Sequence, residues 1–240
     1  MSLATRSAWH VAVVPEGCSC WSLARGRPGD SSGDRAVRRI VRAAPALGVD
    51  VLTIQGLSCD ASREPAEDER TVLARIGAFL EVETPAFLQQ GVRLTVFGCR
   101  QRLPEDVRRV VEVAERSTAG GTRLQLRIAI DCSARGAILV TLLTGIVGHS
   151  VLAREPAGRL GPDVDLLIRT GGERRLADFL LWECARAELC LVDTPWPEFG
   201  ERELAAALAE FQRRAGAPPG TRDGDSTFGA GRATSPAVVT

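Results

Sequence analysis

Two arginines flank a glycine-rich turn at residues 169–175, and this spacing suits the binding of an anion. Arg169 ends a short apolar run, the sequence Thr-Gly-Gly follows, and Arg175 opens a segment with helical periodicity. A turn of this kind exposes backbone N–H groups, and a helix N-terminus favours negative charge. Two guanidinium groups beside free N–H groups would clamp a diphosphate. The spacing equally allows a surface alternative, in which the arginines pair with Glu173 and Asp178.

A carboxylate near the N-terminus provides a second candidate group. Residues 10–22 read HVAVVPEGCSCWS, and the apolar run at 11–14 predicts a buried strand that stops at Pro15. Glu16 follows directly, so we expect its carboxylate at the carboxyl end of that strand. A carboxylate oxygen in this position can bind a hard cation such as Mg²⁺.

Four cysteines that follow predicted strands form a separate candidate site. They are Cys18, Cys59, Cys99 and Cys132. Four thiolates can bind zinc or an iron–sulfur cluster. The sequence has no C-x-x-C spacing, however, and a small buried Cys also replaces Ala, Ser or Asn. The chain has seven cysteines, an odd number that cannot all pair internally, and we expect them to be reduced.

These candidate groups need a sheet that brings the ends of several strands together. Short apolar runs predict strands at 9–14, 49–57, 92–98, 124–130, 165–168 and 189–192. Helical periodicity predicts helices at 34–47, 66–90 (with a bend near Pro85), 104–116, 176–188 and 201–214. Strands that alternate with helices predict an α/β fold, a mostly parallel sheet covered by helices. Ligands of such sheets bind at the carboxyl ends of the strands.

Length and composition favour one domain. The chain has 240 residues, of which 45% are hydrophobic, enough for a single core. From residue 217 onward Gly, Pro, Ser and Thr dominate, so we predict one domain at 1–216 and a disordered tail at 217–240.

The charge balance restricts the class of partner. Thirty basic residues match thirty acidic ones, which favours neither nucleic acid nor a membrane surface as a partner. Every basic residue is Arg, so the position of an arginine is informative and its abundance is not. No stretch approaches the roughly 18 apolar residues of a membrane span, and residues 1–10 lack a secretory signal. We therefore expect a cytoplasmic protein.

The segment 169–199 carries an ordered set of motifs. It contains RTGGE at 169–173, RLADFLLW at 175–182, AEL at 187–189 and WPEF at 196–199. This set resembles the cis-prenyltransferase family, typified by undecaprenyl diphosphate synthase, with its motifs R-T-S/G-G-E, R-L/I-S-N-F-L-L-W, A-E-L and W-P-D/E-F. A weaker resemblance extends over most of the chain to about residue 216. It includes GVRLTVFG at 91–98, RLPEDVRRVVEVAE at 102–115 and LQLRIAIDCSARGAI at 124–138.

The resemblance implies a fold, a reaction and partners. Family members have a homodimeric α/β fold with a hydrophobic tunnel, and they use Mg²⁺. They join isopentenyl diphosphate to an allylic diphosphate and usually set a cis double bond. The expected partners are therefore prenyl diphosphate substrates and a second copy of the chain, or an active homologue in a heterodimer. Contact with a membrane is expected only through the lipid product.

Position in the family motifs assigns substrate binding to seven residues. They are Gly17, Trp21, Arg169, Gly171, Arg175, Arg214 and Gly216. The resemblance implies that Arg169 and Arg175 hold the diphosphate of the homoallylic substrate. Arg214 and Gly216 resemble the R-x-G that reaches into the neighbouring subunit's site, although a helix that ends in Gly explains them nearly as well. Packing under a loop is the alternative role for Trp21.

The same alignment implies metal-binding and catalytic residues. Glu16 and Glu188 fall on the family's magnesium-binding positions. Glu16, Asp131 and Arg63 fall on or beside its catalytic positions. Asp131 replaces a family Asn, and its carboxylate suits either a second cation or the cap of a helix.

The N-terminal half departs from the family pattern. The first family motif, H-V-A-x-I-M-D-G-N-G-R-W-A, has Asp where this chain has Glu16. The extra methylene displaces the carboxylate by more than about 1 Å, so the catalytic geometry need not survive. Cys20 replaces an Arg, which removes a charge-assisted hydrogen bond typically worth ~1.5–3 kcal/mol. Downstream, Ala61 replaces an Asn that assists proton removal, and Arg63 stands one position early for the family arginine.

Three functions are compatible with this pattern. The first is a divergent prenyltransferase that ionises an allylic diphosphate with Mg²⁺ and couples it to isopentenyl or another prenyl diphosphate, with irregular coupling or cyclisation as possible outcomes. The second is a catalytically silent subunit of a heteromeric enzyme. The third is a protein of the same fold whose cysteines bind a metal or do redox chemistry.

Overall fold

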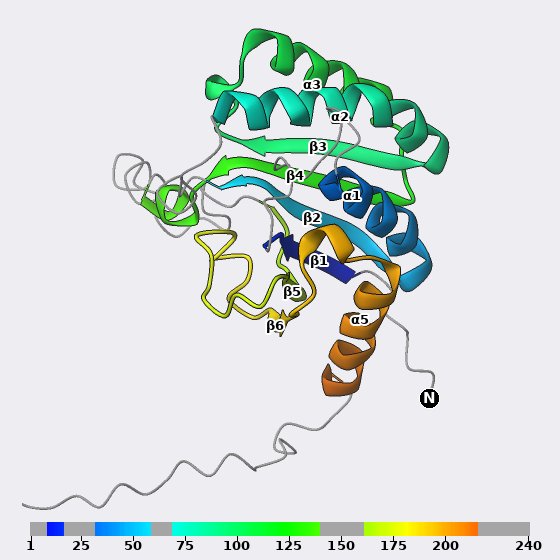
Figure 1. The fold of residues 1–240 in the computed structure, drawn as a ribbon, viewed down its shortest axis with the longest axis vertical. Coiled ribbons are helices and arrows are strands. Elements are labelled where there is room, and N and C mark those ends of the chain that lie inside the picture. Colours follow the sequence, from blue (N-terminus) through cyan, green and yellow to red (C-terminus); the bar gives the residue numbers. More distant parts are fainter. Residues whose placement is uncertain (1–8, 17–31, 59–68, 140–160, 216–240) are drawn as a thin grey trace, which may run out of the picture.

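A six-stranded parallel sheet forms the centre of the molecule (Figure 1). The structure is a computed structural model of the chain, and it describes residues 9–16, 32–58, 69–139 and 161–215. The strands lie in the order β3-β4-β2-β1-β5-β6, and every neighbouring pair is parallel. Their bounds are β1 Trp9–Val14, β2 Val49–Ser58, β3 Val92–Gly98, β4 Leu124–Cys132, β5 Leu166–Arg169 and β6 Glu188–Leu191.

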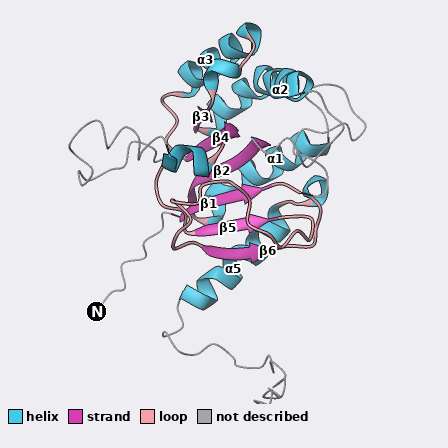
Figure 2. Cartoon of the chain, turned by 90° about the vertical axis from the view of Figure 1, so that its left-hand side faces the viewer, coloured by secondary structure: helices cyan, strands magenta, loops and turns pink. Residues whose placement is uncertain are grey.

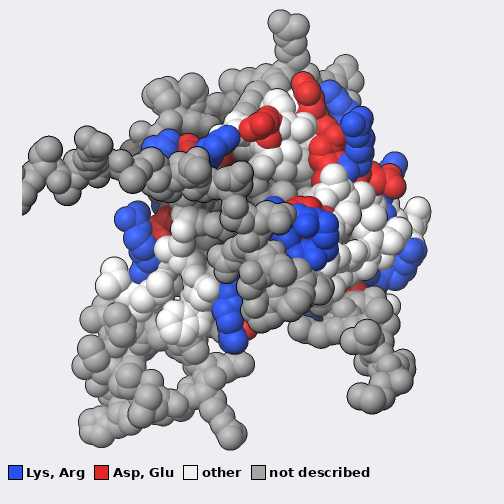
Figure 3. Space-filling model, turned by 90° about the horizontal axis from the view of Figure 1, so that it is seen from below, with Lys and Arg blue, Asp and Glu red and all other residues white. Residues whose placement is uncertain are grey.

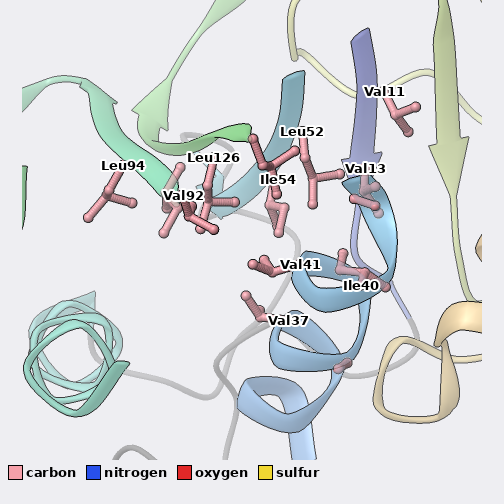
Figure 4. Close-up of a cluster of buried hydrophobic side chains, with 14 of the residues drawn as sticks. Val11, Val13, Val37, Ile40, Val41, Leu52, Ile54, Val92, Leu94 and Leu126 are labelled. Carbon is pink, nitrogen blue, oxygen red and sulfur yellow. The ribbon is translucent and has the colours of Figure 1, made fainter. Parts of the chain in front are cut away.

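Helices cover one face of the sheet and enclose the main core. They are α1 Ser32–Ala43, α2 Glu69–Gln90, α3 Glu105–Thr118 and α5 Glu201–Ala215, with short 3₁₀ turns η1 Ala44–Leu47, η3 Arg100–Arg102 and η4 Trp196–Glu198. Figures 1 and 2 show α2 and α3 near the β3 end of the sheet and α5 near its β5 end. Figure 4 shows α1 directing Val37, Ile40 and Val41 toward the strands, where Val13 and Leu52 meet them.

The opposite face of β4, β1 and β5 is covered by the turns and bends that connect β5 to β6. Because side chains alternate along a strand, Val11 and Val13 enter the main core, whereas Ala12 and Val14 face the opposite side. There they join a smaller buried cluster that includes Phe179 and Leu180.

The predicted strands are confirmed with ends that agree to within two residues. Most predicted helices are confirmed to within four residues, and the largest difference is at α1, which ends at Ala43 before η1. The predicted bend near Pro85 does not interrupt α2, which runs through it. The helix predicted at 176–188 is wrong, because the chain forms turns and bends there. Asp178 explains part of this difference. Its backbone carbonyl accepts a hydrogen bond from Ala134 N–H, and its carboxylate accepts one from Arg135 N–H at 2.9 Å. Leu180 also adopts a φ of 48°, which interrupts a right-handed helix.

The two edges of the sheet differ. At β3, side chains of α3 bond the outward N–H groups of the strand: Glu115 accepts from Val96 N–H at 2.7 Å, and Thr118 accepts from Leu94 N–H at 3.1 Å. At β6, Leu189 and Leu191 are 44% and 48% exposed. One edge is therefore capped, whereas the other presents apolar side chains.

The surface charges and the helix lengths agree with what the composition predicts. Figure 3 shows basic and acidic side chains interspersed on the face seen from below. No helix within the described ranges is long and apolar enough to cross a membrane. The predicted tail at 217–240 lies outside the described residues, and the predicted tunnel stays a prediction.

Candidate functional site

Glu16 lies at the carboxyl end of β1, where Pro15 has ended the strand. The Val14↔Arg169 register places the last residues of β1 and β5 side by side. Thr170 then continues the contact, because its N–H donates to the Val14 carbonyl at 3.2 Å. Glu16 is consequently fixed next to the end of β5.

Arg169 is the most deeply buried charged group of this site, with 5% of its side chain exposed. Its Nη2 donates to Glu16 Oε1 at 2.6 Å. Its Nε and Nη1 are buried and have no hydrogen-bond partner among the described residues. An unpartnered buried donor is unfavourable, and more so when the donor is charged. Arg169 therefore offers the three N–H bonds of these two nitrogens to an acceptor that the described residues do not supply.

Arg175 is paired on the surface, as in the alternative considered from sequence, but its partner is Glu173 and not Asp178. Its Nε and Nη2 contact both Glu173 oxygens at 2.7–3.2 Å. The hydrogen bonds from Arg175 hold the pKa of the Glu173 carboxyl well below its usual range. Glu173 raises the pKa of Arg175, and Glu16 adds a smaller electrostatic contribution. Arg175 is thus within electrostatic reach of Glu16 while another acid holds its guanidinium.

The glycine turn does not expose its N–H groups, so the prediction of a free N–H cradle is wrong. Gly171 N–H donates to the Thr194 carbonyl at 3.0 Å, and Gly172 N–H donates to the Val192 carbonyl at 3.1 Å. Both glycines adopt left-handed φ values of 74° and 75°, which favour glycine. The turn therefore ties the end of β5 to the segment after β6.

Glu188 lies at the opposite end of the strands from Glu16, so the structure does not bring the two predicted metal ligands together within one chain. Glu188 begins β6 and pairs with Leu166, the first residue of β5. Three strand residues, roughly 10 Å, separate this level from Arg169. Arg214 lies nearby, with 3.9 Å between its Nη1 and Glu188 Oε2. Arg214 also bonds Glu210 at 2.6 Å and, after Arg213, helps to lower the pKa of Glu210 to about 2.

Comparison with known proteins identifies the family. A family model described as "Putative undecaprenyl diphosphate synthase" matches residues 14–217. The chain is 41% identical over 216 residues to isoprenyl transferase 1 of Bradyrhizobium diazoefficiens, a match that covers 85% of this chain and 87% of that protein. The chain belongs to the undecaprenyl diphosphate synthase family.

Solved structures agree with this family assignment. Lavandulyl diphosphate synthase from Lavandula x intermedia, in complex with dimethylallyl diphosphate, is 25% identical with a TM-score of 0.72, over 85% of this chain and 94% of that chain. A "probable undecaprenyl diphosphate synthase" from Campylobacter jejuni is 26% identical with a TM-score of 0.71, over 85% and 95% of the two chains.

Several residues assigned from the family motifs lie outside the described part of the chain. They are Gly17, Trp21, Arg63 and Gly216, together with Cys18 and Cys59. Asp131 belongs to β4, but its side chain is also outside the described part. The roles assigned to these residues stay predictions.

The described cysteines do not form a metal site. Among the described residues, no three His, Cys, Asp or Glu side chains are grouped as metal ligands. Cys132 is buried, and its thiol faces the Phe97 carbonyl at 3.6 Å. Burial raises the pKa of the Cys184 thiol to about 12, so this thiol is unreactive at neutral pH.

Two buried polar residues, Thr170 and His10, were not predicted from the sequence as part of a site. Thr170 is fully buried, and its hydroxyl bonds the backbone of Glu16. A threonine directly after the arginine that ends a strand was the available signal. His10 is 4% exposed and contacts the Asp163 carbonyl at 2.9 Å and the Thr53 hydroxyl at 2.7 Å. A histidine in an otherwise apolar strand marks such a buried polar contact.

Proposed function

We propose that this chain is a Mg²⁺-dependent prenyl diphosphate synthase that couples an allylic diphosphate to isopentenyl or another prenyl diphosphate. The observation that supports this function best is the state of Arg169. Its guanidinium is buried beside Glu16 and has two nitrogens without a hydrogen-bond partner among the described residues. Guanidinium forks bind the oxygens of a diphosphate in this way.

The residues present fit a magnesium ion that is held jointly with substrate. Mg²⁺ in phosphate-transferring sites is commonly bound by one or two carboxylates together with substrate phosphates. Glu16 provides such a carboxylate, since its hydrogen bond with Arg169 uses only Oε1. Bound there, Mg²⁺ would neutralise charge on a departing diphosphate.

The side chains of the site would act on two substrates. Arg169 would bind the diphosphate of the homoallylic substrate, and Arg175 would add a second guanidinium once it leaves Glu173. The allylic C–O bond then breaks, and its electron pair leaves with the diphosphate. The double bond of the partner attacks the allylic carbocation, and the released diphosphate takes the proton whose loss restores a double bond.

We infer that the active form is a homodimer joined at the β6 edge. Leu189 and Leu191 are exposed on that edge, and Trp182 and Leu176 of the preceding segment are 54% and 60% exposed. Because Glu188 cannot reach Glu16 of its own chain, a role for Glu188 at the metal would require a second copy. Exposed apolar side chains beside an open strand support such an interface.

A silent subunit is the second candidate, and the Glu16–Arg169 pair favours it. In this pair the acid of the first motif already neutralises the arginine that the diphosphate would need. Such a chain would contribute Glu188 and Arg214 to an active homologue without turning over substrate itself.

One experiment separates these candidates. The purified chain is incubated with Mg²⁺ and dimethylallyl, geranyl or farnesyl diphosphate, each with and without isopentenyl diphosphate, and the products are identified by mass spectrometry. The proposed synthase consumes an allylic diphosphate without any other protein. Activity that arises only after addition of a second homologue would establish the silent subunit instead.

A further inference from the structure

We propose that Thr170 is a positioning residue that fixes the backbone of Glu16, an inference that rests on the function proposed above. Arg169 and Thr170 are consecutive residues, and both contact Glu16. Arg169 holds the carboxylate, whereas Thr170 holds the main chain. These two consecutive residues at the end of β5 thus position Glu16 through its carboxylate and through its main chain.

The hydroxyl of Thr170 bonds both polar backbone groups of Glu16. Oγ1 accepts a hydrogen bond from Glu16 N–H at 2.8 Å and donates one to the Glu16 carbonyl at 3.1 Å. The same carbonyl accepts Trp196 N–H at 3.0 Å. Thr170 is fully buried, so solvent does not compete for these bonds.

These bonds replace the strand ladder at the point where it stops. The pairing of β1 with β5 ends at Val14↔Arg169, and Pro15 has no N–H to continue it. Within the described part of the chain, Glu16 has no strand partner of its own. A hydroxyl both donates and accepts, so it can serve the N–H and the carbonyl together, which a valine of the same shape cannot.

The expected role goes beyond support of the fold. A site that binds metal or phosphate needs its groups within about 0.5 Å of their working positions. Partners that orient a ligand without touching the metal typically change metal affinity or activity by about 10- to 100-fold when they are removed. We therefore expect loss of the Thr170 hydroxyl to weaken ligand binding while the sheet stays folded.

The test compares Thr170→Val and Thr170→Ser in the full-length chain. Calorimetry measures the affinity for inorganic diphosphate at saturating Mg²⁺, and thermal unfolding reports the fold. Thr170→Val is expected to weaken binding by about 10- to 100-fold, and Thr170→Ser, which keeps the hydroxyl, to stay within about threefold of the unmodified chain. If the valine variant does not fold, Thr170→Cys replaces it, because a thiol is a weak donor and acceptor.

Thr53→Val is the matched control. Thr53 is also fully buried, and its hydroxyl bonds His10 away from Glu16. This variant is expected to lower the unfolding temperature and leave diphosphate affinity unchanged. Equal affinity in Thr170→Val and the unmodified chain would overturn the proposal, as would a serine variant as weak as the valine one.

Failure of the proposed function gives a different result. An unmodified chain that binds Mg²⁺ and diphosphate but converts no prenyl diphosphate overturns the synthase and leaves the Thr170 comparison valid. A chain that converts prenyl diphosphates while Thr170→Val binds diphosphate normally overturns the positioning role alone. An unmodified chain that neither binds inorganic diphosphate nor converts prenyl diphosphates overturns both.

Discussion

The two ends of the parallel strands hold charged and polar groups in opposite states. At the carboxyl ends, Arg169 is 5% exposed and keeps two buried nitrogens without a hydrogen-bond partner within the described residues. At the amino ends, Glu188 and Arg214 are 32% and 51% exposed, with 3.9 Å between their charged atoms. Both ends contain an acid–arginine pair, but the pairs differ in burial and in unused hydrogen-bonding capacity.

The buried histidine of the amino end completes this comparison. His10 N–H donates to Asp165 Oδ2 at 2.9 Å, and both ring nitrogens have partners. A polar group with every bond made contributes to the fold, whereas a buried cation with bonds left over suits a ligand. Unused hydrogen-bonding capacity therefore separates Arg169 from His10, although both residues are buried.

The largest effect is expected from Glu16→Ala. Without this carboxylate the site loses the ligand that we propose for Mg²⁺, and the buried Arg169 loses its counter-charge. Turnover of an allylic diphosphate, followed by mass spectrometry, should disappear. Glu16→Asp is the matched control, because it retains a carboxylate. Residual turnover in the alanine variant would place metal binding elsewhere.

Arg169→Ala tests the carboxyl-end pair directly. Loss of charge-assisted hydrogen bonds worth ~1.5–3 kcal/mol should raise KM for the homoallylic substrate by about 10- to 100-fold. Steady-state kinetics at varied isopentenyl diphosphate measure this change. Arg109→Ala is the control, since Arg109 is 74% exposed and pairs with Glu105 on the surface. Unchanged kinetics in Arg169→Ala would contradict its role as a diphosphate ligand.

The stability of the folded chain should depend on pH through His10, which lies near the amino ends of the strands. Burial lowers the pKa of His10 from 6.5 to about 4, so the unfolded chain binds the extra proton between these values. Stability should therefore rise from pH 4 to pH 6.5, by up to roughly 3 kcal/mol. Urea unfolding at several pH values measures the slope. His10→Gln should flatten it, and an equal slope in that variant would assign the titration to another group.

The dimer interface proposed at the β6 edge can be tested separately. Leu189→Asp places a charge on the exposed apolar strand and should shift the protein from dimer to monomer in light scattering. Val113→Asp, on the exposed side of α3, is the control because Val113 is also exposed, at 53%. A dimer that persists in Leu189→Asp would locate the interface elsewhere.

The smallest effect is expected from the exposed Glu188–Arg214 pair. Arg214→Ala should change the free energy of unfolding by less than ~1 kcal/mol, because exposed ion pairs contribute little. Denaturant unfolding measures this value. A larger loss would show that the amino-end pair is a structural contact, and the comparison between the two ends would weaken.

Much of this architecture was predictable from periodicity. Apolar runs located the strands, and the rule that parallel strands align their carboxyl ends anticipated that Glu16 and Arg169 lie together. The helix predicted at 176–188 failed because Asp178 bonds Ser133 and Arg135, contacts between segments distant in sequence. The free N–H cradle failed for the same reason, since the glycine N–H groups bond residues after β6. Local sequence patterns predict strands and helices. They do not show which polar groups will form hydrogen bonds with a segment that is distant in sequence.

The capped β3 strand also limits how far copies of this chain can associate edge to edge. Glu115 and Thr118 already occupy the outward N–H groups of Val96 and Leu94. Two copies that meet at β6 would form one continuous twelve-strand arrangement, six strands from each copy, with a blocked strand at either margin. Growth by further strand addition would end there, so this geometry favours a closed pair over a fibre.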